Sequence, residues 1–416
     1  MVRVLLFSTL FPNAAQPNHG VFVENRLRET LAHGGLEATA LAPVPYFPSS
    51  NAMFGGYAKF ARAPAQEVRF GVEVLHPRYL VIPKLAQNWT PEFLYRSALS
   101  SVRRLAEQGR GFDLIDAHYF YPDGVAAAKL GRTLRLPVVI TARGSDLTLI
   151  PEAEGPRRQI RWAAQEASAT IAVCDDLRSR LIAIGAPEER AVVLRNGVDL
   201  DLFAPADRRS ARRALNLTGF TLLSVGALIP RKGHALVLEA LAQAADCALL
   251  IAGEGLLRGE LEALARRLGV AHRVRFLGEI AHAQLPALYS AADAMVLASS
   301  REGWANVLLE AMACGTPVVA SDVNGTAEVV RSPAAGRLMP ERTPAGLLAA
   351  LLELRRDMPE RAETRRYAER FGWAPVGRAN KALLEAAAEA GYEQRGSAKA
   401  ARAAKSLTTG PVERVD

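Results

Sequence analysis

Short apolar runs rich in β-forming residues alternate with stretches of helical periodicity along this chain, and the alternation starts twice. In the first half the apolar runs cover residues 2–9, 37–43, 112–119, 136–144 and 169–174, and a helical pattern covers 21–33. In the second half the apolar runs cover residues 220–226, 247–253, 274–278, 293–299 and 316–322. A strand, a loop and a helix repeated in this order predict a parallel, doubly wound α/β sheet in each half.

The length of the chain also favours two domains, because 416 residues of which 50% are hydrophobic exceed the size at which one core keeps growing. Turn-forming residues fill the segment 196–205, so we place the junction there. The expected division is an N-terminal domain at 1–200 and a C-terminal domain at 201–375. A helix at 376–392 is expected to cross back to the first domain, and 393–416 is expected to be a disordered tail.

The first eleven residues and the cysteines bear on the compartment. The opening run MVRVLLFSTLF is too short to span a bilayer and lacks a small-residue cleavage site, so it is interpreted as a first buried strand. Cys174, Cys247 and Cys314 lie far apart, without metal-ligand spacing or an even-numbered disulfide framework. These features favour the cytoplasm as the location.

The formal net charge of +8 does not predict binding to nucleic acid, because the surplus is spread along the chain and Arg alternates with Glu. Two interpretations stay open. One is an ordinary solvated surface. The other is a peripheral contact with anionic lipid at the inner face of the membrane, without insertion.

Glu302 and Glu310 are the strongest candidates for chemistry. In open α/β sheets, ligands bind at the carboxyl ends of the strands, and Glu302 follows an expected strand there. A helix-terminal charge is the alternative for Glu302, since carboxylates are favoured at helix N-termini. Glu310 lies in an apolar helical stretch, where an unpaired carboxylate is costly. We expect the hydroxyls of a ribose to be its partner.

Arg231 and Lys232 follow the first strand of the second half, between Gly226 and Gly233 and just before a helix. Two cations beside the free N–H groups of a helix N-terminus form a site suited to a diphosphate. The Walker pattern is absent, so this is not a P-loop. A pair of solvated surface cations is the alternative, and the position after the strand favours the binding role.

In the first half, Gly20 precedes a helix in the loop after the first strand, where its backbone could approach a phosphate. His118 and Tyr119 follow another strand at its carboxyl end, which makes them candidates for the site. The alternative for His118 is a histidine whose hydrogen bonds are satisfied in the core. Arg143 and Asp146 lie on a glycine turn after the next strand. They form either a local ion pair or a polar clamp on substrate.

These residues resemble the family 4 glycosyltransferases of the GT-B fold, over nearly the whole chain up to about residue 390. The most specific element is Glu302, seven intervening residues and Glu310, followed by AMACGTPVVAS and NGTAEVV. It is similar to the family's paired-glutamate motif, in which the first glutamate faces the transferred sugar and the second holds the nucleotide ribose. The resemblance implies two Rossmann-like domains facing each other across a cleft.

The resemblance also implies a set of site residues. The residues that it places in catalysis are Glu302, His118, Arg231 and Lys232. The residues that it places at the donor are Gly20, Arg231, Lys232, Glu302, Trp304, Ala305, Asn306, Val307 and Glu310. The candidates on the acceptor side are Arg143, Asp146 and Tyr119.

Two positions depart from the family's pattern. Many members have an arginine where this chain has Ala227, so the phosphate charge would fall more heavily on Arg231 and Lys232. The family's usual histidine before the glycine of TARGSD is Arg143 here, which puts a shared acceptor specificity in doubt. The Asp-x-Asp metal motif of the other large glycosyltransferase fold is absent, so the resemblance implies neither a metal nor a cofactor.

The expected function is transfer of a hexose-type sugar from a nucleotide diphosphate sugar to an acceptor hydroxyl, with retention of configuration. A sugar or a lipid-linked intermediate of a surface polysaccharide is the expected acceptor. A nucleotide-sugar epimerase or a phosphorylase on the same fold remains an alternative, as does a binding protein without activity. A nicotinamide-dependent oxidoreductase is disfavoured, because Gly-x-Gly-x-x-Gly is absent after the first strand.

Overall fold

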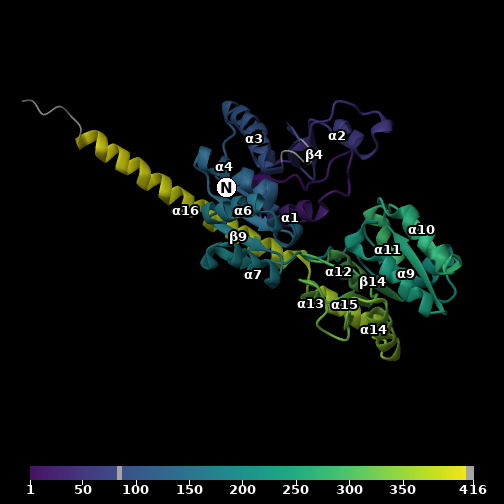
Figure 1. The fold of residues 1–416 in the computed structure, drawn as a ribbon. Helices are drawn as coiled ribbons and strands as arrows, with labels where there is room; N and C mark the ends of the chain where they lie inside the picture. The colour runs from purple at the N-terminus through teal and green to yellow at the C-terminus, as the bar shows by residue number, and fades with distance from the viewer. Residues whose placement is uncertain (82–86, 409–416) are drawn as a thin grey trace, which may run out of the picture.

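The computed structural model describes residues 1–81 and 87–408 and shows two α/β bodies (Figure 1). The sheet of the first body has the strand order β10 (Ala191–Val193), β9 (Ala169–Ala172), β8 (Val138–Ala142), β7 (Leu114–His118), β1 (Val2–Phe7), β2 (Leu36–Leu41), β5 (Val72–Leu75) and β4 (Gln66–Arg69). All neighbouring pairs are parallel except β4 with β5. A small separate sheet pairs β3 (Val44–Pro45) with β6 (Arg78–Tyr79).

The sheet of the second body is parallel throughout. Its strand order is β13 (Val274–Gly278), β12 (Cys247–Ala252), β11 (Phe220–Val225), β14 (Ala294–Leu297), β15 (Val318–Ser321) and β16 (Gly336–Met339). The strands are almost wholly buried, as expected for a sheet covered by helices on both faces. The two doubly wound α/β sheets that the sequence predicted are therefore confirmed.

Helices connect the strands within each body. Those of the first body are α1 (Val21–Ala32), α2 (Ala58–Arg62), α3 (Thr90–Glu107), α4 (Val125–Leu134), α5 (Ser145–Thr148), α6 (Glu154–Glu166) and α7 (Asp175–Ile184). Those of the second are α8 (Arg208–Ala214), α9 (His234–Gln243), α10 (Arg258–Arg267), α11 (Leu285–Ala291), α12 (Asn306–Ala313), α13 (Thr326–Val329), α14 (Pro344–Arg356) and α15 (Arg361–Glu369). No helix within the described ranges is both long and apolar enough to cross a bilayer.

The last helix, α16 (Trp373–Thr408), begins at the junction and runs back across the first body (Figure 1). Leu384 and Ala388 pack in one buried cluster with Val4 and Leu114 of the first sheet. The helix continues to Thr408, which corrects the expectation of a disordered tail from residue 393. The run is rich in Ala, Lys and Arg, which are strong helix formers. The rest of the predicted tail, 409–416, lies outside the described residues.

The short strands β3 and β6, the edge strands β10 and β16, and the pair β4 and β5 were not predicted. Strands β4 and β5 form an antiparallel hairpin at the edge of the first sheet, and their charged side chains hide the apolar pattern. The hairpin turns at Phe70 and Gly71, whose φ angles are 48° and 80°. Two successive left-handed residues are what a two-residue hairpin turn requires.

In both sheets the strand order reverses beside the first strand of the body. In the first sheet β1 lies between β7 and β2, and in the second β11 lies between β14 and β12. Crevices at the carboxyl ends of strands form at such switch points. The loops that carry Gly20, Lys232 and Glu302 follow β1, β11 and β14, and His118 ends β7, so the topology brings these residues to the facing edges of the sheets.

Candidate active site

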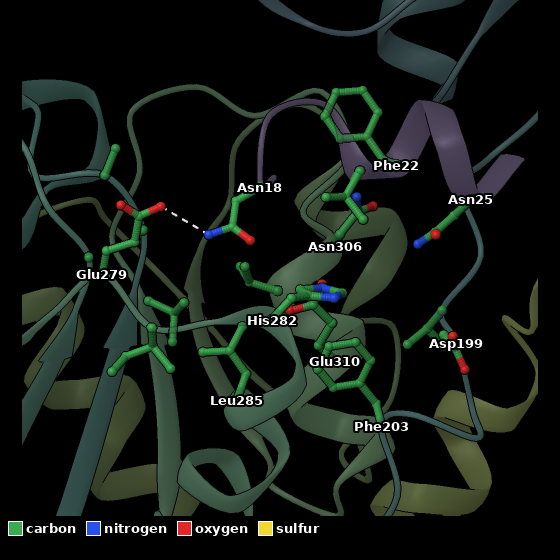
Figure 2. Close-up of a pocket in the computed structure, with 18 of the residues that line it drawn as sticks. Asn18, Phe22, Asn25, Asp199, Phe203, Glu279, His282, Leu285, Asn306 and Glu310 are labelled. Atoms are coloured by element: carbon green, nitrogen blue, oxygen red, sulfur yellow. Dashed lines mark hydrogen bonds and ion pairs between the residues drawn. The ribbon is translucent and has the colours of Figure 1, made fainter. Parts of the chain in front are cut away.

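A cavity of about 700 Å³ opens between the two bodies, and we call it the larger cavity (Figure 2). Most of its wall comes from the second body, including the glycine turns at Gly226 and Gly253 and the start of α12. Asn18 and Phe22 close it from the first body. The Asn18 amide donates a hydrogen bond of 2.9 Å to Glu279, so the two bodies touch at its rim.

Glu310 lines the larger cavity from α12 and is 9% exposed. The buried Tyr289 hydroxyl donates to its Oε2 at 2.9 Å, and Nε2 of His282 lies 3.4 Å from its Oε1. This carboxylate thus already has two side-chain partners, from α11 and from the turn before it, and its pairing with ribose hydroxyls stays a prediction. The same arrangement leaves Glu310 at the cavity wall, facing any ligand there.

His282 and Tyr289 were missed by the sequence analysis. His282 lines the larger cavity, and its ring packs edge-on against Phe203, with 4.9 Å between the ring centroids. Burial alone would lower the pKa of His282, but the hydrogen bond and the charge of Glu310 outweigh burial and raise it. His282 follows β13, so a search of every strand-end loop would have found it. Tyr289 gave no such signal, because it lies inside a short helix.

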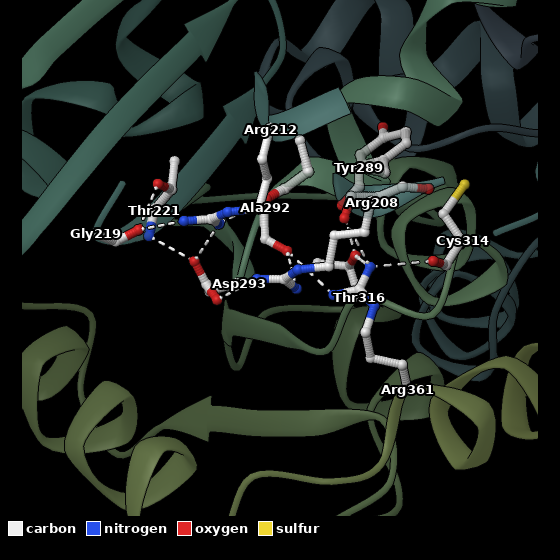
Figure 3. A network of polar contacts seen from close by, with 12 residues as sticks. Arg208, Arg212, Gly219, Thr221, Tyr289, Ala292, Asp293, Cys314, Thr316 and Arg361 are labelled. Atoms are coloured by element: carbon white, nitrogen blue, oxygen red, sulfur yellow. Dashed lines mark hydrogen bonds and ion pairs between the residues drawn. The ribbon is translucent and has the colours of Figure 1, made fainter. Parts of the chain in front are cut away.

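A network of arginines holds α11 in place behind Glu310 (Figure 3). Arg361 donates to the Ser290 and Ala292 carbonyls and to Thr316 Oγ1, the last at 2.6 Å. Thr316 in turn donates to the Tyr289 carbonyl at 2.6 Å. Carbonyls at the C-terminus of a helix lack partners within the helix, and arginine donors satisfy them. The network thereby fixes the position of Tyr289, the partner of Glu310.

Asp293 extends the same network toward α8. It forms ion pairs of 2.6 Å with Arg208 and 3.0 Å with Arg212, and it accepts a backbone hydrogen bond of 2.8 Å from Thr221 (Figure 3). Thr221 is on β11, so these bonds tie α8 to the strand that leads into the Arg231 loop.

A second cavity of about 330 Å³ adjoins the first, and we call it the smaller cavity. Phe22, Asn306 and Val307 line both cavities, so the two lie side by side at these residues. The residues that line only the smaller one include four cationic side chains and one carboxylate: Arg143, Arg231, Lys232, Arg301 and Glu302. Its polar lining is therefore mostly positive.

Glu302 lies at the centre of this charge. Its carboxylate is 8% exposed, 2.6 Å from Lys232 Nζ and 3.4 Å from Arg231 Nη1. Burial alone would raise the pKa of Glu302, and the charges of Lys232 and Arg231 outweigh burial and lower it. The helix-terminal alternative does not fit, because α12 begins only at Asn306. The structure joins Glu302, Arg231 and Lys232, which the sequence singled out separately.

Gly233 shows how the Lys232 loop reaches this position. Its φ is 70°, and a Cβ there would lie 2.1 Å from the Ala298 carbonyl oxygen. Only glycine tolerates both the left-handed conformation and this close approach. The loop after β11 thus lies directly against the end of β14, which brings Lys232 to Glu302.

Gly20 has a similar role in the first body. Its φ is 71°, and a Cβ there would lie 2.3 Å from the Leu10 carbonyl. Gly20 is the residue before α1 and lines neither cavity, whereas its neighbours Val21 and Phe22 line the larger one. The glycine therefore sets the entry of α1 into the cleft.

His118 lies behind the wall of the smaller cavity. The side chain is fully buried and lines neither cavity, and its Nδ1 is 2.6 Å from Nη2 of Arg143. Nε2 lies 3.4 Å from Asp116. Burial, the largest effect, lowers the pKa of His118 to about 4, so the ring is neutral and accepts from Arg143. Arg143 is the side chain of this pair that reaches the cavity.

Asp146 and Tyr119 shape the loop around Arg143. Asp146 is buried and accepts from the backbone N–H groups of Phe120, Arg143 and Gly144 at 2.9, 3.1 and 2.6 Å. Neither sequence interpretation of Asp146 matches, because its carboxylate meets backbone amides instead of the Arg143 guanidinium or a cavity. The Tyr119 hydroxyl pairs with Ser145 at 2.8 Å, and Tyr119 lines neither cavity.

Trp304, Ala305, Asn306 and Val307 all line the smaller cavity, at the turn into α12. Asn306 accepts a hydrogen bond of 3.2 Å from Asn196 of the segment between the bodies. Gly303 packs against the backbone across the cleft, where a Cβ would lie 2.0 Å from the Arg143 carbonyl oxygen. The two site loops therefore touch. In the described part of the chain, no three His, Cys, Asp or Glu side chains gather as a metal site would require.

Comparisons with known proteins agree with this architecture. The model of the glycosyl transferases group 1 matches residues 207–371, and that of glycosyltransferase family 4 matches residues 56–202. A D-inositol 3-phosphate glycosyltransferase of Geodermatophilus obscurus is 33% identical over 353 residues, covering 78% of each chain. The putative teichuronic acid biosynthesis glycosyltransferase TuaC of Bacillus subtilis is 28% identical over 336 residues, 79% of this chain and 83% of that one.

Solved structures show the same fold. Sucrose-phosphate synthase from Thermosynechococcus elongatus superposes with a TM-score of 0.75 at 22% identity, covering 96% of this chain and all (100%) of that one. Anabaena HepE in complex with UDP superposes with a TM-score of 0.69 at 23% identity, covering 93% and 100%. The chain thus has the GT-B fold that the sequence predicted, and it belongs to the family 4 glycosyltransferases.

Proposed function

We propose that the enzyme transfers a hexose-type sugar from a nucleotide diphosphate sugar to an acceptor hydroxyl, with retention of configuration. The observation that carries this proposal is the placement of Lys232 and Arg231 on Glu302 in the smaller cavity, directly beside the larger one. A diphosphate at these cations would have its nucleoside in the larger cavity and its sugar in the smaller one.

The larger cavity suits a nucleoside. Its lining combines apolar side chains such as Val225, Ile280 and Leu285 with the carboxylate of Glu310. Pockets for nucleosides and other small molecules are mostly apolar with a few placed polar groups. Glu310 would accept hydrogen bonds from the ribose hydroxyls with the lone pairs that Tyr289 and His282 leave free.

The chemistry would depend on stabilising the leaving group. As the bond between the anomeric carbon and the phosphate oxygen breaks, negative charge grows on the diphosphate, and Arg231 and Lys232, held by Glu302, would stabilise it. The acceptor hydroxyl forms the new bond on the same face, and its proton passes to the departing phosphate oxygen. The two cations would supply the positive charge without a metal ion or cofactor. Glu302 would orient both cations and face the sugar.

His118 would contribute indirectly. Since its ring is neutral, buried and bonded to Arg143, its place in this scheme is to hold Arg143 at the cavity wall. Trp304, Ala305, Asn306 and Val307 would contact the sugar where α12 begins, and Gly20 would position the α1 backbone near the distal phosphate. Asp146 and Tyr119 would shape the acceptor side through the Arg143 loop.

For the acceptor we propose a sugar or a lipid-linked intermediate of a surface polysaccharide, used in the cytoplasm at the inner face of the membrane. The printed name of the Bacillus subtilis relative, which refers to teichuronic acid biosynthesis, supports this class. The diffuse surplus of positive charge supports a peripheral contact with anionic lipid. No observation favours the epimerase or phosphorylase alternatives over transfer.

The test is a thermal-shift screen of the purified protein against nucleoside diphosphates and nucleotide sugars without added metal. A ligand that binds only the folded state adds about 2.7 kcal/mol at a hundredfold excess over Kd. We expect a shift with one nucleotide that is lost in Lys232→Ala and Glu310→Ala. An absence of shift with every nucleotide would contradict the proposal. Release of a free isomeric sugar without acceptor, or a requirement for inorganic phosphate, would indicate the epimerase or the phosphorylase.

A further inference from the structure

Among the residues that the structure describes, no carboxylate forms an ion pair with the guanidinium of Arg143. Nη1 donates to Asn196 Oδ1 at 2.8 Å, Nη2 contacts the neutral His118 ring, and the buried Nε has no hydrogen-bond partner. Within residues 1–81 and 87–408, no Asp or Glu oxygen lies within 4.0 Å of this guanidinium, whereas Glu302 holds Arg231 and Lys232. Charges buried in proteins are usually paired.

The surroundings of Arg143 add to the imbalance. The Asn196 oxygen that accepts from Arg143 also accepts from the fully buried Arg26 at 3.0 Å. On the other side the guanidinium faces the Phe22 ring, 5.2 Å from its centroid. Burial and the charge of Arg26 lower the pKa of Arg143 well below its usual value, although the buried carboxylates of Asp116 and Asp146 act in the opposite direction. These two carboxylates form no ion pair with the guanidinium, so a ligand anion at this wall would give it a direct counterion.

The charge of the smaller cavity as a whole leads to the same conclusion. Of its four cations, Arg231 and Lys232 are engaged by Glu302 and would also meet the donor diphosphate. Arg301 has only the exposed Glu152 nearby, at 4.0 Å. Two cations, Arg143 and Arg301, thus remain at the sugar end of the cavity after the donor is counted.

We propose that the acceptor carries an anionic group, a carboxylate or a phosphate, and that Arg143 selects for it. This inference rests on the proposed function, because it assigns the charge to one of the two substrates. Arg143 belongs to the first body and Asn196 to the segment between the bodies, while Arg231, Lys232 and Glu302 belong to the second. Arg143 therefore lies on the wall opposite the donor groups, where the acceptor enters. Loss of its charge would abolish the preference for anionic acceptors and leave nucleotide binding intact.

The experiment uses the full chain saturated with the nucleoside diphosphate found by thermal shift, so that the phosphate site is already filled. Glucose, glucose 6-phosphate and glucuronate are then titrated in a calorimeter. We expect both anions to bind at least about tenfold more tightly than glucose, a difference of about 1.4 kcal/mol. Equal binding of all three sugars, or binding of none, overturns the inference. Failure of the nucleotide itself to bind contradicts the proposed function instead.

Arg143→Met, which removes the charge, is compared with Arg132→Met, which removes an exposed cation of α4 that lines neither cavity. The preference for anions should disappear only in Arg143→Met, with the nucleotide Kd within about twofold of wild type. A preference that survives in Arg143→Met overturns the inference. If Arg143→Met does not fold, as its circular dichroism would show, Arg143→Lys and Arg143→His replace it, and the preference should persist at about pH 8 only with lysine.

A final experiment tests whether the anionic group belongs to the acceptor or to the transferred sugar. The affinities of wild type for a hexose and a hexuronic acid carried on the same nucleotide are compared. We expect the two affinities to agree within about threefold. The reason is that the donor would bind to groups of the second body, whereas Arg143 belongs to the first. A strong preference for the uronic acid donor that Arg143→Met removes would place the anion on the donor and overturn the assignment to the acceptor.

Discussion

The two cavities of the cleft differ in how their charges are balanced. In the larger cavity the carboxylate of Glu310 is partnered by a tyrosine hydroxyl and an imidazole, behind which arginines are bonded to backbone carbonyls. In the smaller cavity the carboxylate of Glu302 faces Lys232 and Arg231, while Arg143 contacts the neutral groups of Asn196 and His118.

We infer from this difference that the larger cavity would serve mainly to bind the donor and the smaller one to carry out the reaction. In the proposed function the larger cavity holds a neutral nucleoside, which needs shape and a few hydrogen bonds. The smaller cavity would meet the departing diphosphate, which gains negative charge during the reaction and needs positive charge that is oriented beforehand. The same contrast predicts which substitutions change rate and which change affinity.

Lys232→Ala should have the largest effect, because it removes the cation closest to Glu302 and to the growing charge of the leaving group. We expect kcat to fall by about 10²–10³-fold. The measurement is steady-state release of the nucleoside diphosphate. Arg267→Ala, which removes an exposed cation at the end of α10, is the control and should behave as wild type. A variant that lost only affinity, with kcat unchanged, would erase the contrast between the cavities.

Glu310→Gln should weaken nucleotide binding by about tenfold or more, since a hydrogen bond to a charged group contributes about 1.5–3 kcal/mol. In contrast with Lys232→Ala, kcat at saturating donor should change little. Calorimetric titration of the nucleoside diphosphate measures the effect. Glu260→Gln, at an exposed carboxylate of α10, serves as the control. If kcat fell as steeply as with Lys232→Ala, both cavities would have the same role.

Tyr289→Phe should destabilise the fold by about 1–3 kcal/mol, because the Glu310 oxygen then loses its buried donor. Urea unfolding measures this change. The Thr316 bond to the Tyr289 carbonyl is retained in the variant, so the backbone of α11 should stay in place. A stability equal to that of wild type would mean that the hydroxyl is not the main partner of Glu310.

The pairing of His282 with Glu310 should give the smallest effect, under about 1 kcal/mol. The folded pKa of His282 is raised above its ordinary value of 6.5, so folding takes up a proton. Its stabilisation is therefore fully present below about pH 6.5 and is lost as the pH rises through the raised pKa. Urea unfolding of wild type and His282→Gln at about pH 6 and pH 9 measures it. The difference between the two proteins should be larger at the lower pH, and the reverse order would contradict the pairing.

Much of the fold could be predicted because its signals are local. The strands of both sheets around the switch points are continuous apolar runs, and those runs stand out against the helices between them. The edge hairpin of β4 and β5 could not be predicted in this way, since its strands are four residues each and contain polar and charged residues among the apolar ones. The helix from 393 to 408 was misjudged, because its composition fits both a solvated tail and a helix.

The candidate site was predicted unevenly for the same reason. Glu302, Lys232 and Arg231 follow strands, and the rule that ligands bind at strand ends identified them one by one. Tyr289 lies within a helix, so no local signal marked it. His118 and Arg143 were separate candidates in the sequence, 25 residues apart, and their contact depends on the pairing of β7 with β8.

The sequence by itself determined two doubly wound sheets, the strand ends that carry the site and the kind of charge at each of them, because periodicity and turn residues act within a few positions of the chain. Only the tertiary structure decided which charges are satisfied. It placed Tyr289 against Glu310, Lys232 and Arg231 against Glu302, and the guanidinium of Arg143 against Asn196 and the neutral His118 ring. Pairing depends on distances between loops of different strands, and those distances exist only after the sheets have formed and packed.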